Sequence, residues 1–511
     1  MNVDTFLRHH GISDNPFTAE EARLDPIFGR LIGGTTDHPD FPKILGQIDQ
    51  PATAVVFGEK GSGKTAIRLM LGRKINEHNS KSGKPVLVVA YDDLNPVLDK
   101  LLQHKRQDTD AMLKGFRLED HQDAILARAM TKMVSAIIDD PTTKNDHSEP
   151  VPRLDTSAKA MRSLSKQTRI DLAILAALYD EPRSGPALPR FRKLKRKLRI
   201  GQRVAIWVVS TLAIVFAVAA AALWGAEKIM DDPPSWMVPG IIAAGGLALL
   251  FMAYAAWRWF SIWGKAFAVR KEMPAVTRSA ADLRAMFELI KPSQLSGQPL
   301  PRPTKGDDLS DTRYQLTRRF VSAIKEMGFA GMVVFVDRMD EPTLVHGDVD
   351  RMKQITWPMF DNKFLKQDSV GLKLLLPLEL RYELGRESAT FFQEARLDKQ
   401  NMVDRLTWSG ATLYDLCSQR LQACADPNRE TKPTLASLFE ESVTPNMLID
   451  ALDQMHQPRD AFKFLYAVIQ EHCKLVPEDQ GDYHIARLTL ETVRRDQAQR
   501  VQELYRGRAP A

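Results

Sequence analysis

A glycine-rich segment between an apolar run and a helical pattern constrains the fold of this chain more than any other feature. Residues 55–65 read VVFGEKGSGKT, and a helical pattern follows over residues 66–77. The fixed positions of the pattern G-x-x-x-x-G-K-[ST] are filled by Gly58, Gly63, Lys64 and Thr65. A strand, a tight turn and a helix in this order predict an α/β fold built on a parallel sheet.

The same segment predicts a phosphate site. Glycines such as Gly58, Gly61 and Gly63 allow backbone N–H groups to surround a phosphate, and the following helix directs its dipole at it. Lys64 would reach the β- and γ-phosphates, and the Thr65 hydroxyl would hold Mg²⁺. We therefore expect ATP and Mg²⁺ as ligands. The alternative is a glycine-rich turn without a ligand.

Charge and cysteine content narrow the class of protein. The chain has 511 residues, enough for two or three domains, and a formal charge of +6. Basic side chains concentrate in residues 183–203, and the remainder is net acidic, so a nucleic-acid surface is not indicated. Cys417, Cys424 and Cys473 lack C-x-x-C spacing, which favours reduced thiols. The first ten residues have no apolar core of a secretory signal.

Two uncharged apolar segments, residues 204–226 and 233–257, predict membrane-spanning helices. At about 1.5 Å per residue, each exceeds a hydrocarbon core of roughly 30 Å. The alternative is a pair of buried helices in a large soluble core. Basic residues flank the outer ends and residues 227–232 are net acidic, which predicts two spans with both termini cytoplasmic. The basic flank would control topology or bind anionic lipid headgroups.

A second motif lies far along the chain. Residues 331–341 read GMVVFVDRMDE, an apolar run that ends in Asp337 and is followed by Asp340 and Glu341. This is the Walker B arrangement, in which a first carboxylate completes the Mg²⁺ shell and a later one orients the attacking water. We assign Asp337 to the metal, Glu341 to the general base and Asp340 to an auxiliary role. We expect this strand to lie adjacent to the strand that precedes Gly58.

Residues 372–376 predict the next strand, where many such ATPases carry Asn or Thr; Pro377 and Glu379 stand there instead. Residues 401–422 and 434–472 are helical by pattern and predict an α-helical lid. Within this lid Arg459 opens a helix and would turn toward the γ-phosphate; a solvated or ion-paired arginine is the alternative.

The first fifty residues form a lead-in that either covers the nucleotide base or packs as a surface arm. They contain the triplet Asn15-Pro16-Phe17. Residues 487–505 predict a polar helix that serves as a solvated face or a partner surface.

An ATPase with two membrane helices between its Walker A and Walker B strands resembles the KAP family of membrane-associated P-loop NTPases. The resemblance rests on the placement of the spans and on residues 58–65, 336–341 and 458–460. The lead-in triplet is also similar to origin-recognition-type AAA ATPases. These resemblances imply a doubly wound αβα ATPase core, oligomeric or switch-like action, and assembly of complexes at the inner face of a membrane, including phage exclusion. The KAP motif tends to read Asp-Asp-x-Asp-Arg, so Glu341 as the last acid favours hydrolysis here.

The predicted organisation is an α/β P-loop core interrupted by a membrane hairpin and followed by a helical lid. The predicted segments are a lead-in (1–50), the first part of the core (51–140), a helical and basic insert (141–203), the spans (204–226 and 233–257), a juxtamembrane helix and linker (258–310), the second part of the core (311–400) and the lid with a C-terminal helix (401–511).

The leading hypothesis for function is a membrane-tethered ATPase that regulates or assembles a complex with an unidentified protein partner, as a homo-oligomer in contact with inner-membrane lipids. A slow nucleotide-dependent switch or scaffold is one alternative. An origin-recognition-like, DNA-associated ATPase is the other, and the charge distribution disfavours it.

Overall fold

The computed structural model contains a five-stranded parallel sheet with strand order β2-β3-β4-β1-β5. The strands are β1 (Ala54–Gly58), β2 (Val86–Tyr91), β3 (Gly331–Val336), β4 (Val370–Pro377) and β5 (Asn401–Val403). Every residue of β1, β3 and β4 is buried. Parallel strands covered on both faces have this continuous apolar sequence, and the predicted α/β class is confirmed.

The structure describes residues 1–18, 22–31, 38–81, 83–105, 108–140, 150–152, 154–182, 185–200, 206–230, 233–301, 308–427, 432–477 and 481–505. Parts of the predicted helical and basic insert (141–203) and of the predicted juxtamembrane helix and linker (258–310) fall outside these ranges.

The strand order corrects the expected adjacency of the two motif strands. β4 lies between β1 and β3, so the strands that carry the two motifs are not neighbours. β4 pairs with β1 in parallel, with Gly58 opposite Pro377. Residues 370–377 are as apolar and as buried as β1, which suits them to a central position.

A second correction concerns the start of the predicted helical lid. Asn401–Val403, expected in a helix, forms the edge strand β5 and pairs with β1. The helix begins only at Gly410, after the Ser409 side chain accepts the Thr412 N–H as an N-cap. Likewise, residues 434–444 precede the next α-helix instead of belonging to it.

The chain divides into two compact units. The first comprises Met1–His78, Val333–Lys353 and Phe360–Ala511. The helices lying wholly or mostly in it are α1 (Val3–His9), α2 (Pro26–Leu31), α3 (Phe41–Leu45), α4 (Lys64–Lys81), α16 (Val349–Thr356), α17 (Asn362–Leu365), α18 (Leu378–Leu384), α19 (Ala389–Ala395), α20 (Gly410–Ala423), α21 (Pro445–Asp453), α22 (Pro458–Leu475) and α23 (Arg487–Tyr505), with 3-10 turns at Leu397–Lys399 and Ala436–Leu438.

The second unit comprises Asn79–Met332 and Gln354–Met359. Its helices are α5 (Asn95–Lys105), α6 (Thr109–Lys114), α7 (Leu118–Ile138), α8 (Ala158–Ser163), α9 (Lys166–Tyr179), α10 (Ala187–Lys197), α11 (Ile206–Ile229), α12 (Met237–Glu272), α13 (Ala280–Glu288), α14 (Pro292–Ser296) and α15 (Asp308–Glu326), with a 3-10 turn at Trp357–Met359.

In the first unit, the lead-in packs on the C-terminal helices. Phe17 is buried in the same apolar cluster as residues of α20, α21 and α22, and its ring stacks on Phe462 at 6.2 Å. The buried Arg420 donates to the Pro16 carbonyl at 2.8 Å and pairs with Asp25. The Asn-Pro-Phe triplet is therefore part of a hydrophobic core.

The later part of the lead-in is attached to the sheet by a buried lysine of β4. The Lys373 ammonium donates to the carbonyls of Ile44, Leu45 and Ala52 at 2.7, 3.1 and 2.8 Å. Burial lowers the pKa of Lys373 to about 8. Three carbonyl acceptors match its three N–H donors, so this side chain fixes the end of α3 against β4.

In the second unit, α7, α9 and α15 pack together around a buried ion pair. Arg313 of α15 donates to the Asp123 carboxylate of α7 at 3.2 and 3.3 Å, and both side chains are almost fully buried. The Tyr179 hydroxyl of α9 donates to the same carboxylate at 2.8 Å. Arg313 also donates to the Glu272 carbonyl at the end of α12. One buried charge pair thus connects four helices.

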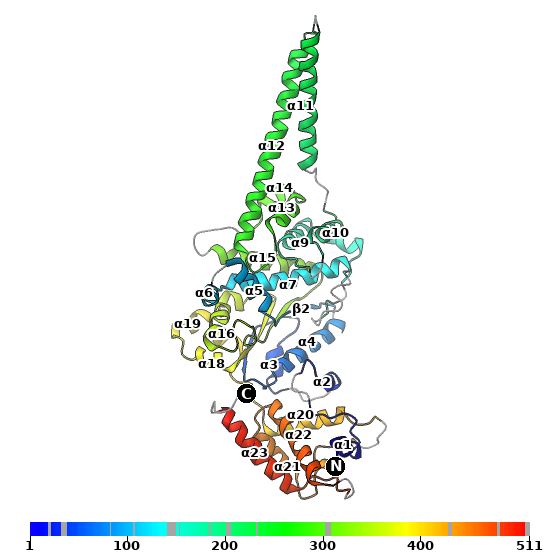
Figure 1. Ribbon diagram of the computed structural model, residues 1–511, viewed down its shortest axis with the longest axis vertical. Coiled ribbons are helices and arrows are strands. Elements are labelled where there is room, and N and C mark those ends of the chain that lie inside the picture. Colours follow the sequence, from blue (N-terminus) through cyan, green and yellow to red (C-terminus); the bar gives the residue numbers. More distant parts are fainter. Residues whose placement is uncertain are drawn as a thin grey trace. The chain divides into compact units, whose positions relative to one another are not determined.

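Helices α11 and α12 run side by side (Figure 1) and are long and apolar enough to cross a membrane. Only 11% of the most apolar window of each is buried, whereas a core helix of a soluble protein is mostly buried. Their exposed large apolar residues include Ile214, Val218, Trp224, Ile242, Leu249, Leu250, Trp257 and Phe260.

The helix bounds differ from the two segments predicted. Residues 204–205 and 231–232 lie outside the described residues. α12 continues to Glu272, well beyond the expected end at residue 257. Its last turns are no longer uniformly apolar and bury Ile262, Ala266 and Val269, and this part of the unit includes contact between α12 and α13. At about 1.5 Å per residue the helix is roughly 54 Å long, more than a membrane requires.

Candidate functional site

The glycine-rich segment forms a tight loop between the end of β1 and the start of α4. Gly61 and Gly63 have φ angles of +95° and +88°, a region that glycine adopts without steric cost. The Ser62 N–H and hydroxyl both donate to the Glu59 carbonyl, at 3.2 and 2.8 Å. We call residues 58–65 the glycine loop. Both positions with a positive φ angle are therefore occupied by glycines, which adopt it without strain.

The structure brings the glycine loop and the second motif together. The Thr65 hydroxyl donates to the Asp337 carboxylate at 3.0 Å across 272 positions of sequence. Asp337 follows β3 directly and is 1% exposed. Burial raises the pKa of Asp337, and the hydrogen bond from Thr65 opposes that rise. A hydroxyl and a buried carboxylate therefore converge beside the start of α4.

Lys64 lies folded onto its own loop, where its ammonium donates to the Gly58 and Glu59 carbonyls at 2.7 and 2.9 Å. Burial lowers the pKa of Lys64. Four nearby carboxylates raise the same pKa against the effect of burial. From the largest effect to the smallest, they are Asp340, Asp337, Glu379 and Glu59. The lysine is thus a buried cation in an acidic surrounding.

The two acids assigned to catalysis have different environments. Asp340 is half-buried and is the carboxylate with the largest influence on the pKa of Lys64. Glu341 is 47% exposed and forms an ion pair with Arg338, which has a positive φ of 63°. The structure therefore groups Asp340 with Lys64, whereas Glu341 pairs with its own neighbour. The assignment of Glu341 as general base stays a prediction.

The start of α22 contacts the glycine loop. A Cβ atom added at Gly61 would lie 2.8 Å from the Gln457 amide oxygen and 3.1 Å from Arg459 side-chain atoms. Arg459 therefore lies against the loop, and its contact with a γ-phosphate stays a prediction. Trp408 adds a hydrogen bond from its indole N–H to the Ser62 carbonyl, at 2.8 Å.

Glu59 links the glycine loop to two distant segments. Its carboxylate accepts hydrogen bonds from Arg405, which follows β5, and from Gln457, the N-cap residue of α22. The sequence analysis did not identify Glu59, Arg405, Gln457 or Trp408 as site residues. Glu59 occupies a variable position of the motif, and nothing in the local sequence pairs it with residues nearly 400 positions away.

The oxygens at this site suit a magnesium ion bound together with phosphates. Mg²⁺ prefers oxygen ligands and is commonly held by one or two carboxylates, waters and phosphate oxygens. Thr65 and Asp337 supply a hydroxyl and a carboxylate within one hydrogen bond of each other. Among the described residues, no three His, Cys, Asp or Glu side chains gather as a metal cluster. Thr65 and Asp337 could therefore contribute two oxygen ligands to such an ion.

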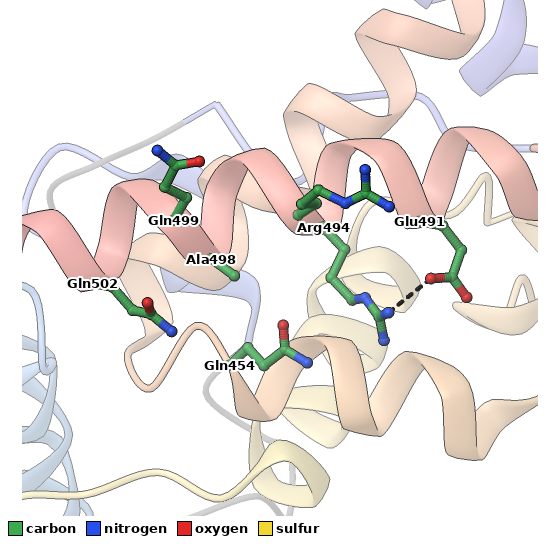
Figure 2. Close-up of a pocket in the computed structure, with 7 residues that line it drawn as sticks. Gln454, Glu491, Arg494, Ala498, Gln499 and Gln502 are labelled. Atoms are coloured by element: carbon green, nitrogen blue, oxygen red, sulfur yellow. Dashed lines mark hydrogen bonds and ion pairs between the residues drawn. The ribbon is translucent and has the colours of Figure 1, made fainter.

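A separate cavity of about 410 Å³ lies on the C-terminal helices (Figure 2). Its lining residues are Gln454, Glu491, Arg494, Arg495, Ala498, Gln499 and Gln502. Arg494 is paired with Glu491 at 2.7 Å. No residue of the glycine loop or of the second motif lines this cavity, so it is distinct from the site described above.

Comparison with known proteins found no matching family model, no matching curated protein and no matching solved structure. The function is therefore argued from the geometry of the glycine loop and its neighbours.

Proposed function

We propose that this chain is an Mg²⁺-dependent ATPase with a P-loop core, tethered to a membrane by α11 and α12. The observation that carries the proposal is the hydrogen bond between Thr65 and Asp337, made beside Lys64 at the carboxyl ends of β1 and β3. A magnesium-bound triphosphate requires this combination of a lysine, a hydroxyl and a carboxylate.

The arrangement of the strands supports a nucleotide site at this edge. After β1 the chain continues to β2, which lies at one end of the strand order. After β4 it continues to β5, which lies at the other end. Ligands of open parallel sheets bind at carboxyl ends where neighbouring strands lead in opposite directions. β1 and β4 are such neighbours, and the glycine loop begins where β1 ends.

Each residue has a definite part in binding. Lys64 exchanges its two carbonyl acceptors for β- and γ-phosphate oxygens, and the N–H groups of the glycine loop surround the β-phosphate. Thr65 and Asp337 hold the magnesium ion, which supplies charge neutralisation for the phosphates.

The direct test uses the purified full-length chain: ATP binding and phosphate release should both require Mg²⁺. A chain that shows neither in the presence of Mg²⁺ overturns the proposal.

Arg459 is expected to contact the γ-phosphate from the start of α22. Arg459→Ala should weaken ATP binding by roughly 10- to 150-fold, since a hydrogen bond to a charged group contributes about 1.5–3 kcal/mol. ADP binding should change little. Arg487→Ala, a half-exposed arginine of α23, is the matched control. Titration with fluorescent ATP and ADP analogues measures both, and equal losses for the two nucleotides would contradict a γ-phosphate contact.

The tether rests on the exposed apolar surface of α11 and α12. The wild-type chain should remain with membranes through alkaline carbonate washing and require detergent for release. Val218→Arg combined with Leu249→Arg should release it or prevent its accumulation in membranes, because each central arginine costs about 2.5–3.5 kcal/mol. Both positions are exposed, at 61% and 66%. Leu488→Arg, on α23, is the control, and carbonate release of the wild-type chain would exclude a spanning tether.

A slow nucleotide switch is the second candidate, and one contact favours it. The ion pair between Glu341 and Arg338 engages the acid that the sequence assigns to water activation. A site so arranged would bind ATP and retain it for long periods. The turnover rate of the wild-type chain separates the two, and the KAP resemblance adds the expectation that either form acts on a partner complex at the cytoplasmic face.

A further inference from the structure

The end of β4 places an unassigned carboxylate beside the proposed phosphate site. β4 is the direct neighbour of β1, and its last residue, Pro377, lies opposite Gly58. The chain then enters α18, which carries Glu379 in its first turn. Because the two strands are parallel, Glu379 and the glycine loop both lie at the carboxyl ends of the strands.

The lysine of the glycine loop lies at this edge too. The Lys64 ammonium is 2.7 Å from the carbonyl oxygen of Gly58. Gly58 is the residue of β1 that lies opposite Pro377, the last residue of β4. The carboxylate of Glu379 is one of four that raise the pKa of Lys64 against the effect of burial; Glu341 is not among them. Two independent observations, strand register and electrostatic proximity, therefore bring Glu379 to the lysine.

The Glu379 carboxylate is available for chemistry. Its side chain is exposed, and among the described residues no hydrogen bond or ion pair engages its carboxylate. Glu341 is paired with Arg338, and Glu59 is held by Arg405 and Gln457. Asp340 follows β3, one strand further from β1, and has a shorter side chain. Glu379 is therefore a long, accessible acid just after β4, a strand that pairs with β1 up to Gly58.

We propose that Glu379, and not Glu341, accepts the proton from the water that attacks the γ-phosphate of bound ATP. The inference rests on the proposed function. The water oxygen forms a bond to the γ-phosphorus, the bond from that phosphorus to the β–γ bridging oxygen breaks, and ADP leaves with the electron pair. The water proton passes to the Glu379 carboxylate, which then returns it to phosphate or solvent. A positioned general base of this kind contributes typically 10²- to 10⁴-fold.

The experiment compares three single variants of the full-length chain in detergent. Glu379→Gln should bind Mg²⁺ and ATP like wild type and lower the single-turnover rate at least a hundredfold. Glu341→Gln is measured beside it, and a loss of turnover as large as or larger than that of Glu379→Gln would overturn the inference. Glu383→Gln, one turn further along α18 and paired with Lys353 and Arg386, is the matched control and should be near wild type.

The outcomes separate this inference from the proposed function. A wild-type chain that neither binds nor hydrolyses ATP refutes the function itself. If the wild-type chain hydrolyses ATP, a Glu379→Gln rate within threefold of wild type overturns the inference. Loss of ATP affinity in Glu379→Gln also overturns it, since a proton acceptor is not required for binding. Retained affinity with lost turnover supports it and shows that the variant is folded.

Discussion

Lys64→Ala is expected to weaken ATP binding at least about a hundredfold. Its ammonium would contact two phosphates, and each charge-assisted hydrogen bond contributes about 1.5–3 kcal/mol. The free energy of unfolding should change little, because two effects oppose each other. The variant loses the hydrogen bonds to two carbonyls, but it also removes a cation whose pKa is lowered by burial. Titration of the full-length chain with a fluorescent ATP analogue and Mg²⁺ measures the effect.

Lys74→Ala is the matched control for this substitution, because Lys74 is an exposed lysine on the same helix, α4. It should bind ATP like the wild-type chain. Wild-type affinity in Lys64→Ala would show that the glycine loop is a structural turn, and the ATPase proposal would then fail at its first step.

Arg313→Met is expected to destabilise the second unit by about 3–5 kcal/mol, the typical cost of leaving a buried partner charge uncompensated. Asp123 would remain buried, and among the residues that the structure describes the Tyr179 hydroxyl would be its remaining hydrogen-bond donor. Burial lowers the pKa of Arg313, and the neighbouring Asp123 and Tyr179 raise it, so that the net direction is a rise; burial raises the pKa of Asp123. Hydrogen exchange of the full-length chain in detergent should show roughly a hundredfold or greater loss of protection in α7, α9 and α15.

Two further variants identify the cause of that loss. Arg318→Met, an exposed arginine on the same helix, should stay within about 0.5 kcal/mol of wild type. Arg313→Met combined with Asp123→Leu should recover most of the protection, because apolar replacement of a whole buried pair is often neutral or stabilising. If the double variant is no better protected than Arg313→Met, then packing, and not the uncompensated charge, explains the loss.

Local patterns predicted the elements of the fold well. The strand expected over residues 372–376 occurs as Val370–Pro377, and the helical pattern over residues 66–77 lies within the helix Lys64–Lys81. Both predictions depend on apolar periodicity within one segment. The closeness of Thr65 and Asp337 was also expected, because it follows from two motifs that serve one ligand.

Long-range arrangement could not be read from the same patterns. No local property of residues 370–377 indicates that they lie between β1 and β3. Strand order depends on how all the apolar segments pack together. Asn401–Val403 became an edge strand because β1 has a free edge there, which a helical periodicity does not reveal. The contact of Glu59 with Gln457 spans 398 positions, and no sequence spacing encodes it.

The discontinuous first unit has a consequence for biosynthesis. The residues that must meet as Thr65 and Asp337 are 272 positions apart, and α11 and α12 are translated between them. At about 5–20 residues per second, the ribosome needs roughly 14–54 s to travel from one to the other. During that interval the nascent polypeptide contains Thr65 but not yet Asp337, while α11 and α12 emerge from the ribosome. The hydrogen bond that joins the two motifs can therefore form only after both apolar helices have been synthesised.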